Sequence, residues 1–166
     1  MDALPDGARL VTHPSGLLAL EVEHPTCRAT LFMHGATLTS WIPEGHDDVL
    51  YLSPRSHFRR DKPIRGGVPL CFPWFGPREG RAQHGFARVS PWALRQVEAL
   101  DTGVRVVLGL EGPHPDLPVP FSARYTVSLG ATLQCTLAVT HDDPVALAYE
   151  DALHAYFAVT DVRRAR

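Results

Sequence analysis

The 166-residue sequence is short of cysteine and of long apolar runs, and each shortage excludes a class of protein. Cys27, Cys71 and Cys135 are odd in number and form no CxxC pair, so the sequence predicts neither a disulfide framework nor a cysteine-based zinc site. No apolar stretch approaches the roughly 20 residues that cross a bilayer. The first residues, MDALPDGARL, carry an acidic side chain where a signal peptide has a positive region, and we therefore expect a cytoplasmic protein.

Metal-ligating patterns are also absent, although the sequence contains nine histidines. No HxH or HExxH spacing occurs, so no pair of imidazoles is placed by sequence to share one zinc ion. Histidine remains the side chain most able to exchange protons near neutral pH. We therefore predict no metal and no cofactor, and the histidines become candidates for acid–base chemistry.

Positive charge is concentrated in one segment of the chain. Residues 55–88 hold eight basic and two acidic side chains, a net formal charge of +6, whereas the whole chain has a net charge of −2. Fifteen of the 16 basic residues are arginine, whose planar guanidinium binds phosphate or carboxylate through paired hydrogen bonds that lysine cannot copy. The segment also carries backbone-shaping residues, namely Gly66, Gly67, Gly76, Gly80, Gly85, Pro63, Pro69, Pro73 and Pro77. The sequence therefore predicts an ordered site for an anion, and a phosphate fits it better than a diffuse polyanion.

Outside this segment the apolar residues mostly alternate with polar ones, which is typical of strands with one buried face. Turn signals rich in proline and glycine separate these stretches. Residues 146–155 alone also fit a helix. We predict one all-β domain over residues 1–166, a two-sheet sandwich. Its strands are expected within residues 8–13, 16–24, 27–43, 48–53, 92–99, 104–110, 123–141 and 145–159.

Three blocks of sequence resemble a known family. They are KPIRGGVPLCFPWFG at 62–76, QHGFAR at 83–88 and ALHAYF at 152–157. In combination they are similar to the glucose-6-phosphate 1-epimerases (hexose-6-phosphate mutarotases), a branch of the galactose mutarotase-like superfamily. The resemblance implies a sandwich of that type, here incomplete at its C-terminal end, because family members continue further. The additional part of those proteins supplies a catalytic glutamate and a substrate-binding aspartate.

The reaction implied by the resemblance exchanges the α and β anomers of a hexose 6-phosphate by opening and reclosing the sugar ring. One group must take the proton of the C1 hydroxyl, and another must deliver a proton to the ring oxygen. An imidazole, with an ordinary pKa of about 6.5, suits the second task near neutral pH. The resemblance assigns that role of general acid to His154, and Tyr156 follows it on the same face of the expected strand.

Four further residues match site positions of the family. His84 corresponds to a second active-site histidine, expected near the reacting ring atoms. Arg65, Gln83 and Arg88 correspond to positions that hold the hexose phosphate, and two guanidiniums converging on one phosphate give strong, bidentate hydrogen bonds. No residue here matches the family's catalytic glutamate, so we expect weak activity.

Other interpretations remain open from the residues alone. His154 could be a half-buried strand histidine bonded to backbone, and His84 could be a simple turn residue beside Gly85. Trp74 and Phe75 could stack on a pyranose, although burial is the safer expectation for at least one of them. A non-catalytic sugar-phosphate-binding protein of the same fold is the main alternative, and a nucleic-acid-binding module is disfavoured because prolines and large apolar residues interrupt the basic segment. We expect either that a second copy or another chain covers the face left open by the missing strands, or that the chain is a truncated product with little activity, and we expect no membrane partner.

Overall fold

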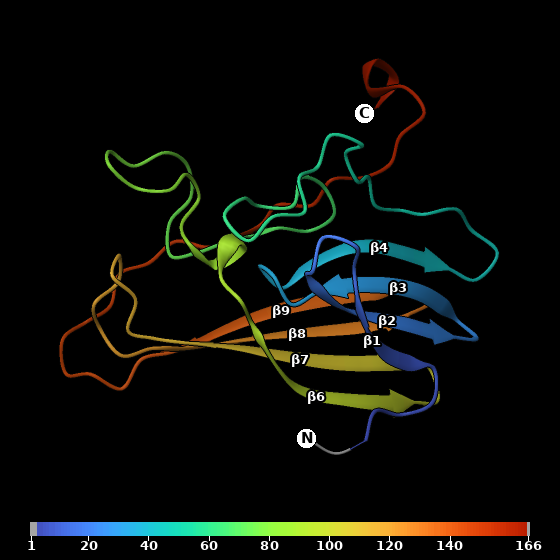
Figure 1. Cartoon of the computed structure of the whole chain (residues 1–166), viewed down its shortest axis with the longest axis horizontal. Coiled ribbons are helices and arrows are strands. Elements are labelled where there is room, and N and C mark those ends of the chain that lie inside the picture. The colour runs from blue at the N-terminus through green and yellow to red at the C-terminus, as the bar shows by residue number, and fades with distance from the viewer. Residues whose placement is uncertain (1–2, 166) are drawn as a thin grey trace.

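Two four-stranded antiparallel sheets, stacked face to face, make up most of the protein (Figure 1). The structure is a computed structural model and describes residues 3–165. In the first sheet, neighbouring strands follow one another along the chain, and a bulge at Thr39 of the fourth strand, opposite Thr30 and Leu31, shifts its register against the third. These strands are β1 (Ala8–Thr12), β2 (Leu18–His24), β3 (Cys27–Phe32) and β4 (Thr37–Pro43).

The second sheet is also a simple meander. Its central pair is in continuous register from Gly103 opposite Gly130 to Glu111 opposite Ser122. A bulge between Leu94 and Gln96 marks one outer strand, and the other outer strand pairs without a break. The strands are β6 (Ala93–Leu100), β7 (Gly103–Glu111), β8 (Ser122–Gly130) and β9 (Leu133–Thr140).

The alternation seen in the sequence explains why the two sheets stack. On β7, Val104, Val106 and Leu108 are at most 1% exposed, and on β2 and β3 Leu20 and Leu31 are completely buried. Side chains two residues apart share one face of a strand, so each sheet presents an apolar face to the other. The predicted all-β, two-sheet fold is confirmed.

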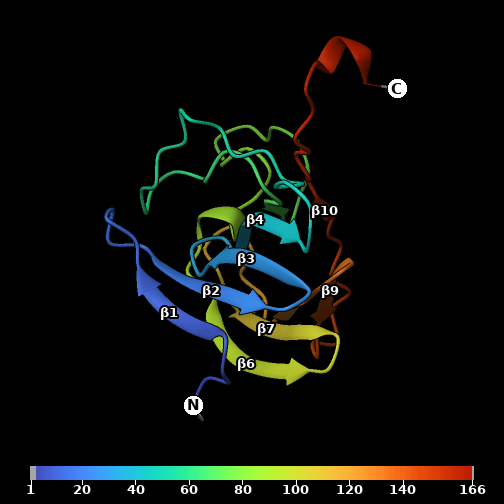
Figure 2. The ribbon, with the colours of Figure 1, turned by 90° about the vertical axis from the view of Figure 1, so that its right-hand side faces the viewer.

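The basic segment and the last part of the chain lie together on one side of the sandwich, at the top of Figures 1 and 2. Val68 N–H donates to Leu38 O of β4 (2.8 Å), so this segment extends the first sheet beyond its free edge. Regular structure here is limited to β5 (Leu70–Cys71), β10 (Ala152–Leu153) and two short 3-10 helices, η1 (Ala87–Val89) and η2 (Val162–Arg164). β10 pairs with β5, with Ala152 opposite Cys71 and Leu153 opposite Leu70.

Most strand predictions are confirmed, but two need correction. Residues 48–53 form no strand and make two isolated bridges, Leu50 with Phe157 and Leu52 with Gly66. The strand expected over 145–159 is reduced to β10, and the helical alternative for 146–155 is wrong as well. The partner segment explains the short pairing, because Pro69 and Pro73 have no N–H to donate to a ladder.

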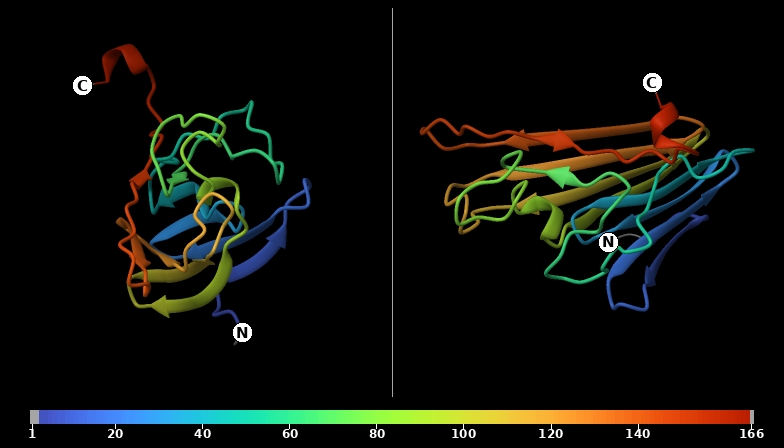
Figure 3. Two further views of the ribbon diagram at one scale, coloured as in Figure 1. Left: turned by 90° about the vertical axis from the view of Figure 1, so that its left-hand side faces the viewer. Right: turned by 90° about the horizontal axis from the view of Figure 1, so that it is seen from above.

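β9 is an outer strand of the second sheet (Figure 3), and the segment that follows it exposes several apolar side chains. β9 pairs with β8 on one side, and within residues 3–165 no strand pairs with its other side. Phe157, Val159 and Val162 are each more than half exposed. In the same described range, no helix is long and apolar enough to cross a membrane.

Candidate active site

The loop from Gly76 to His84 is closed by two hydrogen bonds between its ends. His84 N–H donates to Gly76 O (2.8 Å), and Gly76 N–H donates to His84 Nδ1 (3.0 Å). The chain leaves this loop through two left-handed residues, His84 (φ 63°) and Gly85 (φ 73°). A Cβ at Gly85 would collide with the carbonyl oxygen of Phe72, so glycine permits the close backbone approach that places His84 here.

These contacts define the chemical state of His84. Because Nδ1 accepts a hydrogen bond from a backbone N–H, the neutral ring carries its proton on Nε2. Burial lowers the pKa of His84 below its ordinary value, and the neighbouring Arg88 and His154 lower it further. His84 is therefore a neutral imidazole near pH 7 that offers an N–H donor from Nε2.

Two arginines approach the same place from different segments. Arg65 is exposed and lies in a loop whose backbone is fixed by two serines. Arg65 N–H donates to Ser56 Oγ (2.9 Å), and Ser53 N–H donates to Arg65 O (3.0 Å). Arg88 is half-buried in η1, and its Nη2 donates to Gln83 O (2.6 Å). Burial lowers the pKa of Arg88, and the nearby charge of Arg65 adds to this effect.

A cavity of about 360 Å³ brings these groups together. Four of the five predicted site residues line it, and among the described residues its walls include two guanidiniums and no carboxylate. An uncompensated positive pocket of this kind attracts an anion. The lining residues are Tyr51, Ser53, Pro63, Ile64, Arg65, Gly66, Pro69, Gln83, His84, Arg88 and Tyr156.

His154, the fifth predicted residue, lies beside this cavity and is not part of its lining. Its ring centroid is 6.0 Å from that of His84 and 4.8 Å from that of Tyr156, which does line the cavity. The backbone N–H of His154 donates to Pro69 O (3.0 Å), which fixes the residue just after β10. Its Nδ1 atom is buried and has no hydrogen-bond partner within residues 3–165. Leaving a buried polar atom without a partner costs free energy.

The two aromatic candidates have different environments. Trp74 is 1% exposed and donates from Nε1 to Ala82 O (3.0 Å), so it belongs to the core. Phe75 is 50% exposed, and its ring lies 4.7 Å from that of His84 and 6.3 Å, nearly parallel, from that of His154. Only Phe75 of this pair can offer a face to a sugar.

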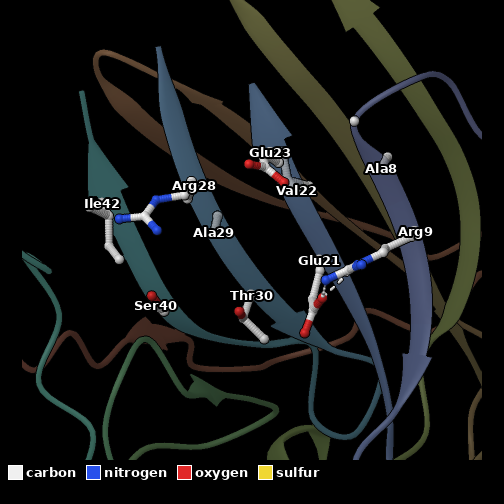
Figure 4. A pocket seen from close by; sticks show the side chains of 11 residues that line it. Ala8, Arg9, Glu21, Val22, Glu23, Arg28, Ala29, Thr30, Ser40 and Ile42 are labelled. Atoms are coloured by element: carbon white, nitrogen blue, oxygen red, sulfur yellow. Dashed lines mark hydrogen bonds and ion pairs between the residues drawn. The ribbon is translucent and has the colours of Figure 1, made fainter. Parts of the chain in front are cut away.

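A second hollow, of about 400 Å³, lies on the outer face of the first sheet (Figure 4). Its charges are largely compensated, because Arg9 Nε donates to Glu21 Oε2 (2.8 Å) and Glu23 lies opposite Arg28 on the paired strand. It contains no imidazole among its lining residues. The histidine-lined cavity is therefore the better candidate for proton-transfer chemistry.

Sequence reasoning missed two residues of the cavity wall. Tyr51 and Ser53 belong to a stretch that was expected to be an ordinary strand, and no motif marks them. Tyr51 and Ser53 reach the cavity wall because their backbone passes close to Gly66. This glycine has φ 118°, and a Cβ on it would lie 2.7 Å from the Cα of Leu52. The glycine pair in IRGGV was the one available signal that another backbone passes close to this segment.

Comparison with known proteins identifies the relatives of this chain. The family model described as aldose 1-epimerase matches residues 19–166. A protein of Salmonella typhimurium named "Putative glucose-6-phosphate 1-epimerase" is 38% identical over 146 residues, which are 85% of this chain and 48% of that protein. A protein of Escherichia coli with the same name is 36% identical over 86% of this chain and 49% of its own length. The chain thus spans about half the length of the curated relatives it matches.

Solved structures agree with these matches. The crystal structure of "a putative mutarotase (YeaD)" from Salmonella typhimurium superposes with a TM-score of 0.88 and 34% identity, covering 97% of this chain and 55% of that one. A galactose mutarotase related enzyme from Lactobacillus acidophilus, at 16% identity and a TM-score of 0.65 over 89% of this chain and 51% of that one, shares the fold alone. The predicted galactose mutarotase-like fold is confirmed, and the chain belongs to the aldose 1-epimerase family.

Proposed function

We propose that the histidine-lined cavity binds a hexose 6-phosphate and exchanges its α and β anomers. The observation that carries this proposal is the convergence of Arg65, Arg88, Gln83 and His84 on one cavity with His154 at its border. A phosphorylated sugar supplies both an anion for the arginines and a reducing ring for the histidines. The names of the relatives favour glucose 6-phosphate among such sugars.

The arginines supply the binding energy in this proposal. The like charges of Arg65 and Arg88 line one cavity and repel each other, and a dianionic phosphate between them removes that repulsion. Gln83 lies on the same wall and can both donate to and accept from sugar hydroxyls. The proposal places the activity in the cytoplasm, because a phosphorylated sugar does not cross a bilayer unaided.

The histidines have different tasks. His154 delivers a proton to the ring oxygen as general acid, and the neutral His84 donates from Nε2 to an oxygen near C1. No carboxylate lines the cavity within residues 3–165, so in this proposal the proton of the C1 hydroxyl passes to solvent water. We therefore propose slower exchange than an enzyme with a placed base would give.

The same absence of a carboxylate in the described cavity favours one alternative, a sugar-phosphate-binding protein without catalysis. Both functions use the arginines in the same way and differ only in whether bound sugar opens its ring faster than free sugar. A measurement of binding together with one of anomer exchange separates them.

Two-dimensional exchange NMR on glucose 6-phosphate, with and without protein, tests the proposal directly. We expect exchange between anomers faster than in buffer, together with calorimetric binding of glucose 6-phosphate and much weaker binding of unphosphorylated glucose. Binding with exchange at the buffer rate selects the non-catalytic alternative. Absence of binding to any hexose 6-phosphate overturns both.

A further inference from the structure

Glu150 makes a contact that ties the C-terminal segment to the histidine loop. Its Oε2 atom accepts a hydrogen bond from Phe75 N–H (2.9 Å), and Arg78 Nη2 lies 3.7 Å from the same oxygen. The backbone around Glu150 is fixed independently, because Glu150 N–H donates to Pro73 O (3.0 Å) and β10 follows directly. The carboxylate is therefore held in place on the residue before Gly76, whose N–H contacts His84.

We propose that Glu150 is a positioning residue that fixes the orientation and tautomer of His84 through the backbone of Phe75. Phe75 N–H bonds to Glu150, and the next N–H, that of Gly76, bonds to His84 Nδ1. Two successive backbone donors are thus both satisfied, and neither can rotate without breaking a contact. The catalytic consequence rests on the function proposed above, whereas the effect on His84 does not.

The hydrogen bond from Gly76 N–H to His84 Nδ1 determines which tautomer of His84 is favoured. A Gly76 N–H aimed at Nδ1 disfavours the tautomer that carries its proton on that atom, and it disfavours the doubly protonated ring as well. The proton is left on Nε2 as a donor. If the backbone at Phe75 were free to turn, Nδ1 would lose this partner and both neutral tautomers would become populated.

The ring of Phe75 provides a second link between the backbone that Glu150 holds and the two histidines. It lies 4.7 Å from His84 and 6.3 Å from His154, stacked at 19° on the latter. Since Phe75 is half exposed, packing alone holds it weakly, and the hydrogen bond from its N–H to Glu150 supplies an anchor. Glu150 itself does not line the cavity, and its carboxylate is occupied by Phe75 and Arg78, so it is poorly placed to act as a base.

The tautomer of His84 in the free protein is the direct test. Long-range ¹H–¹⁵N correlation spectra of the ¹⁵N-labelled full chain distinguish protonated from unprotonated ring nitrogens, and His84→Gln assigns the signal. We compare Glu150→Ala with Glu150→Gln, which keeps an acceptor oxygen, and with Asp151→Ala as a control on the adjacent exposed acid. We expect a single Nε2-protonated form in the wild type, Glu150→Gln and Asp151→Ala, and mixed tautomers with a raised pKa of His84 in Glu150→Ala.

Kinetics give a second readout. We expect Glu150→Ala to slow anomer exchange about threefold to tenfold, as loss of a partly exposed charge-assisted hydrogen bond predicts, with little change in sugar-phosphate affinity and recovery in Glu150→Gln. An unchanged His84 spectrum in a folded Glu150→Ala protein, or mixed tautomers in the wild type, overturns the positioning role. A normal spectrum without sugar-phosphate binding leaves that role intact and overturns the proposed function instead.

Discussion

The imidazole rings of His84 and His154 lie 6.0 Å apart although one ends a loop after β5 and the other follows β10. Their proximity depends on a two-residue ladder, in which Ala152 pairs with Cys71 and Leu153 with Leu70. A shift of this register by one residue would turn His154 to the opposite face. The short β5–β10 pairing is therefore the part of the fold that assembles the candidate active site.

Arginine substitutions test the phosphate-binding wall. We expect Arg65→Ala and Arg88→Ala each to weaken glucose 6-phosphate binding about ten- to a hundredfold, since each removes charge-assisted hydrogen bonds to the ligand. Arg88→Lys should recover little, because lysine lacks the planar fork. Arg55→Ala is the matched control, since Arg55 belongs to the same basic segment and does not line the cavity. Isothermal titration calorimetry measures all four, and equal losses in the control would indicate a general charge effect.

Replacing the general acid should separate catalysis from binding. We expect His154→Gln to reduce anomer exchange to nearly the buffer rate, because a placed acid or base contributes about 10²- to 10⁴-fold to such steps. The dissociation constant for glucose 6-phosphate should change little, since the arginines remain. Exchange NMR and calorimetry on one sample measure both quantities, with the exposed His46→Gln as control. Retained exchange in His154→Gln would assign the proton transfer to another group.

The regular alternation of apolar and polar residues in the sequence was sufficient to predict most of the strands and their two-sheet arrangement. β7 is the clearest case, because Val104, Val106 and Leu108 face the core in the period-2 pattern that the sequence shows. The prediction was wrong where pairing depends on a distant partner. Residues 145–159 have strong strand propensity, but their partner contains Pro69 and Pro73, and local sequence carries no information about which segment will lie opposite.

The candidate site was predicted through its motifs and not through its geometry. Arg65, Gln83 and Arg88 were selected by charge and resemblance, and the structure places them on one wall. The contribution of Tyr51 could not be predicted, since it depends on a loop packed against Gly66. Glu150 lies just before the ALHAYF block, and no motif of the sequence marks it. Its contact with Phe75 N–H arises from tertiary pairing and has no signature in the sequence.

Two glycines of the basic segment provide a matched test of backbone packing. Gly85 and Gly80 both have positive φ, 73° and 68°, so alanine is similarly strained at either position, by about 1–2 kcal/mol. A Cβ at Gly85 would collide with Phe72 O, whereas nothing lies within 4 Å of a Cβ at Gly80. We expect Gly85→Ala to lower the free energy of unfolding by about 2 kcal/mol more than Gly80→Ala, measured by urea denaturation. Equal decreases in the free energy of unfolding would show that the strained φ, and not the collision with Phe72 O, determines the effect.

The open edge of the second sheet should make the chain self-associate. β9 contains no charge, proline or glycine from Leu133 to Thr140, whereas the other edge strand, β6, carries Arg95, Glu98 and a bulge. Uncharged, unbroken edges pair with other strands, and lysine blocks such pairing. We expect concentration-dependent dimers by sedimentation equilibrium, reduced by Thr136→Lys and unaffected by Gln96→Lys on β6. A monomer at all concentrations would contradict pairing through this edge.

Three histidines give the unfolding free energy a defined dependence on pH. Burial lowers the pKa of His84 and of His114, which stacks on Phe86 at 3.6 Å, so the unfolded chain binds a proton more readily at these sites. Their contribution to stability is complete above about pH 6.5, the ordinary pKa, and is lost as the pH falls through the lowered values. The contribution of His141 to stability has the opposite dependence on pH, because hydrogen bonds to the carbonyl groups of Val145 and Pro120 raise its pKa.

We therefore expect the urea midpoint to fall as the pH drops below about 6.5, the ordinary histidine pKa, because the unfolded chain then binds protons that folded His84 and His114 resist. His114→Gln should make that fall shallower, since it removes one of the two groups whose pKa is lowered. His141→Gln should instead change the profile above about pH 6.5, because protonation of His141 in the folded chain stabilises it as the pH drops toward that value. A profile that is identical in both variants and the wild type would assign the pH dependence to other groups.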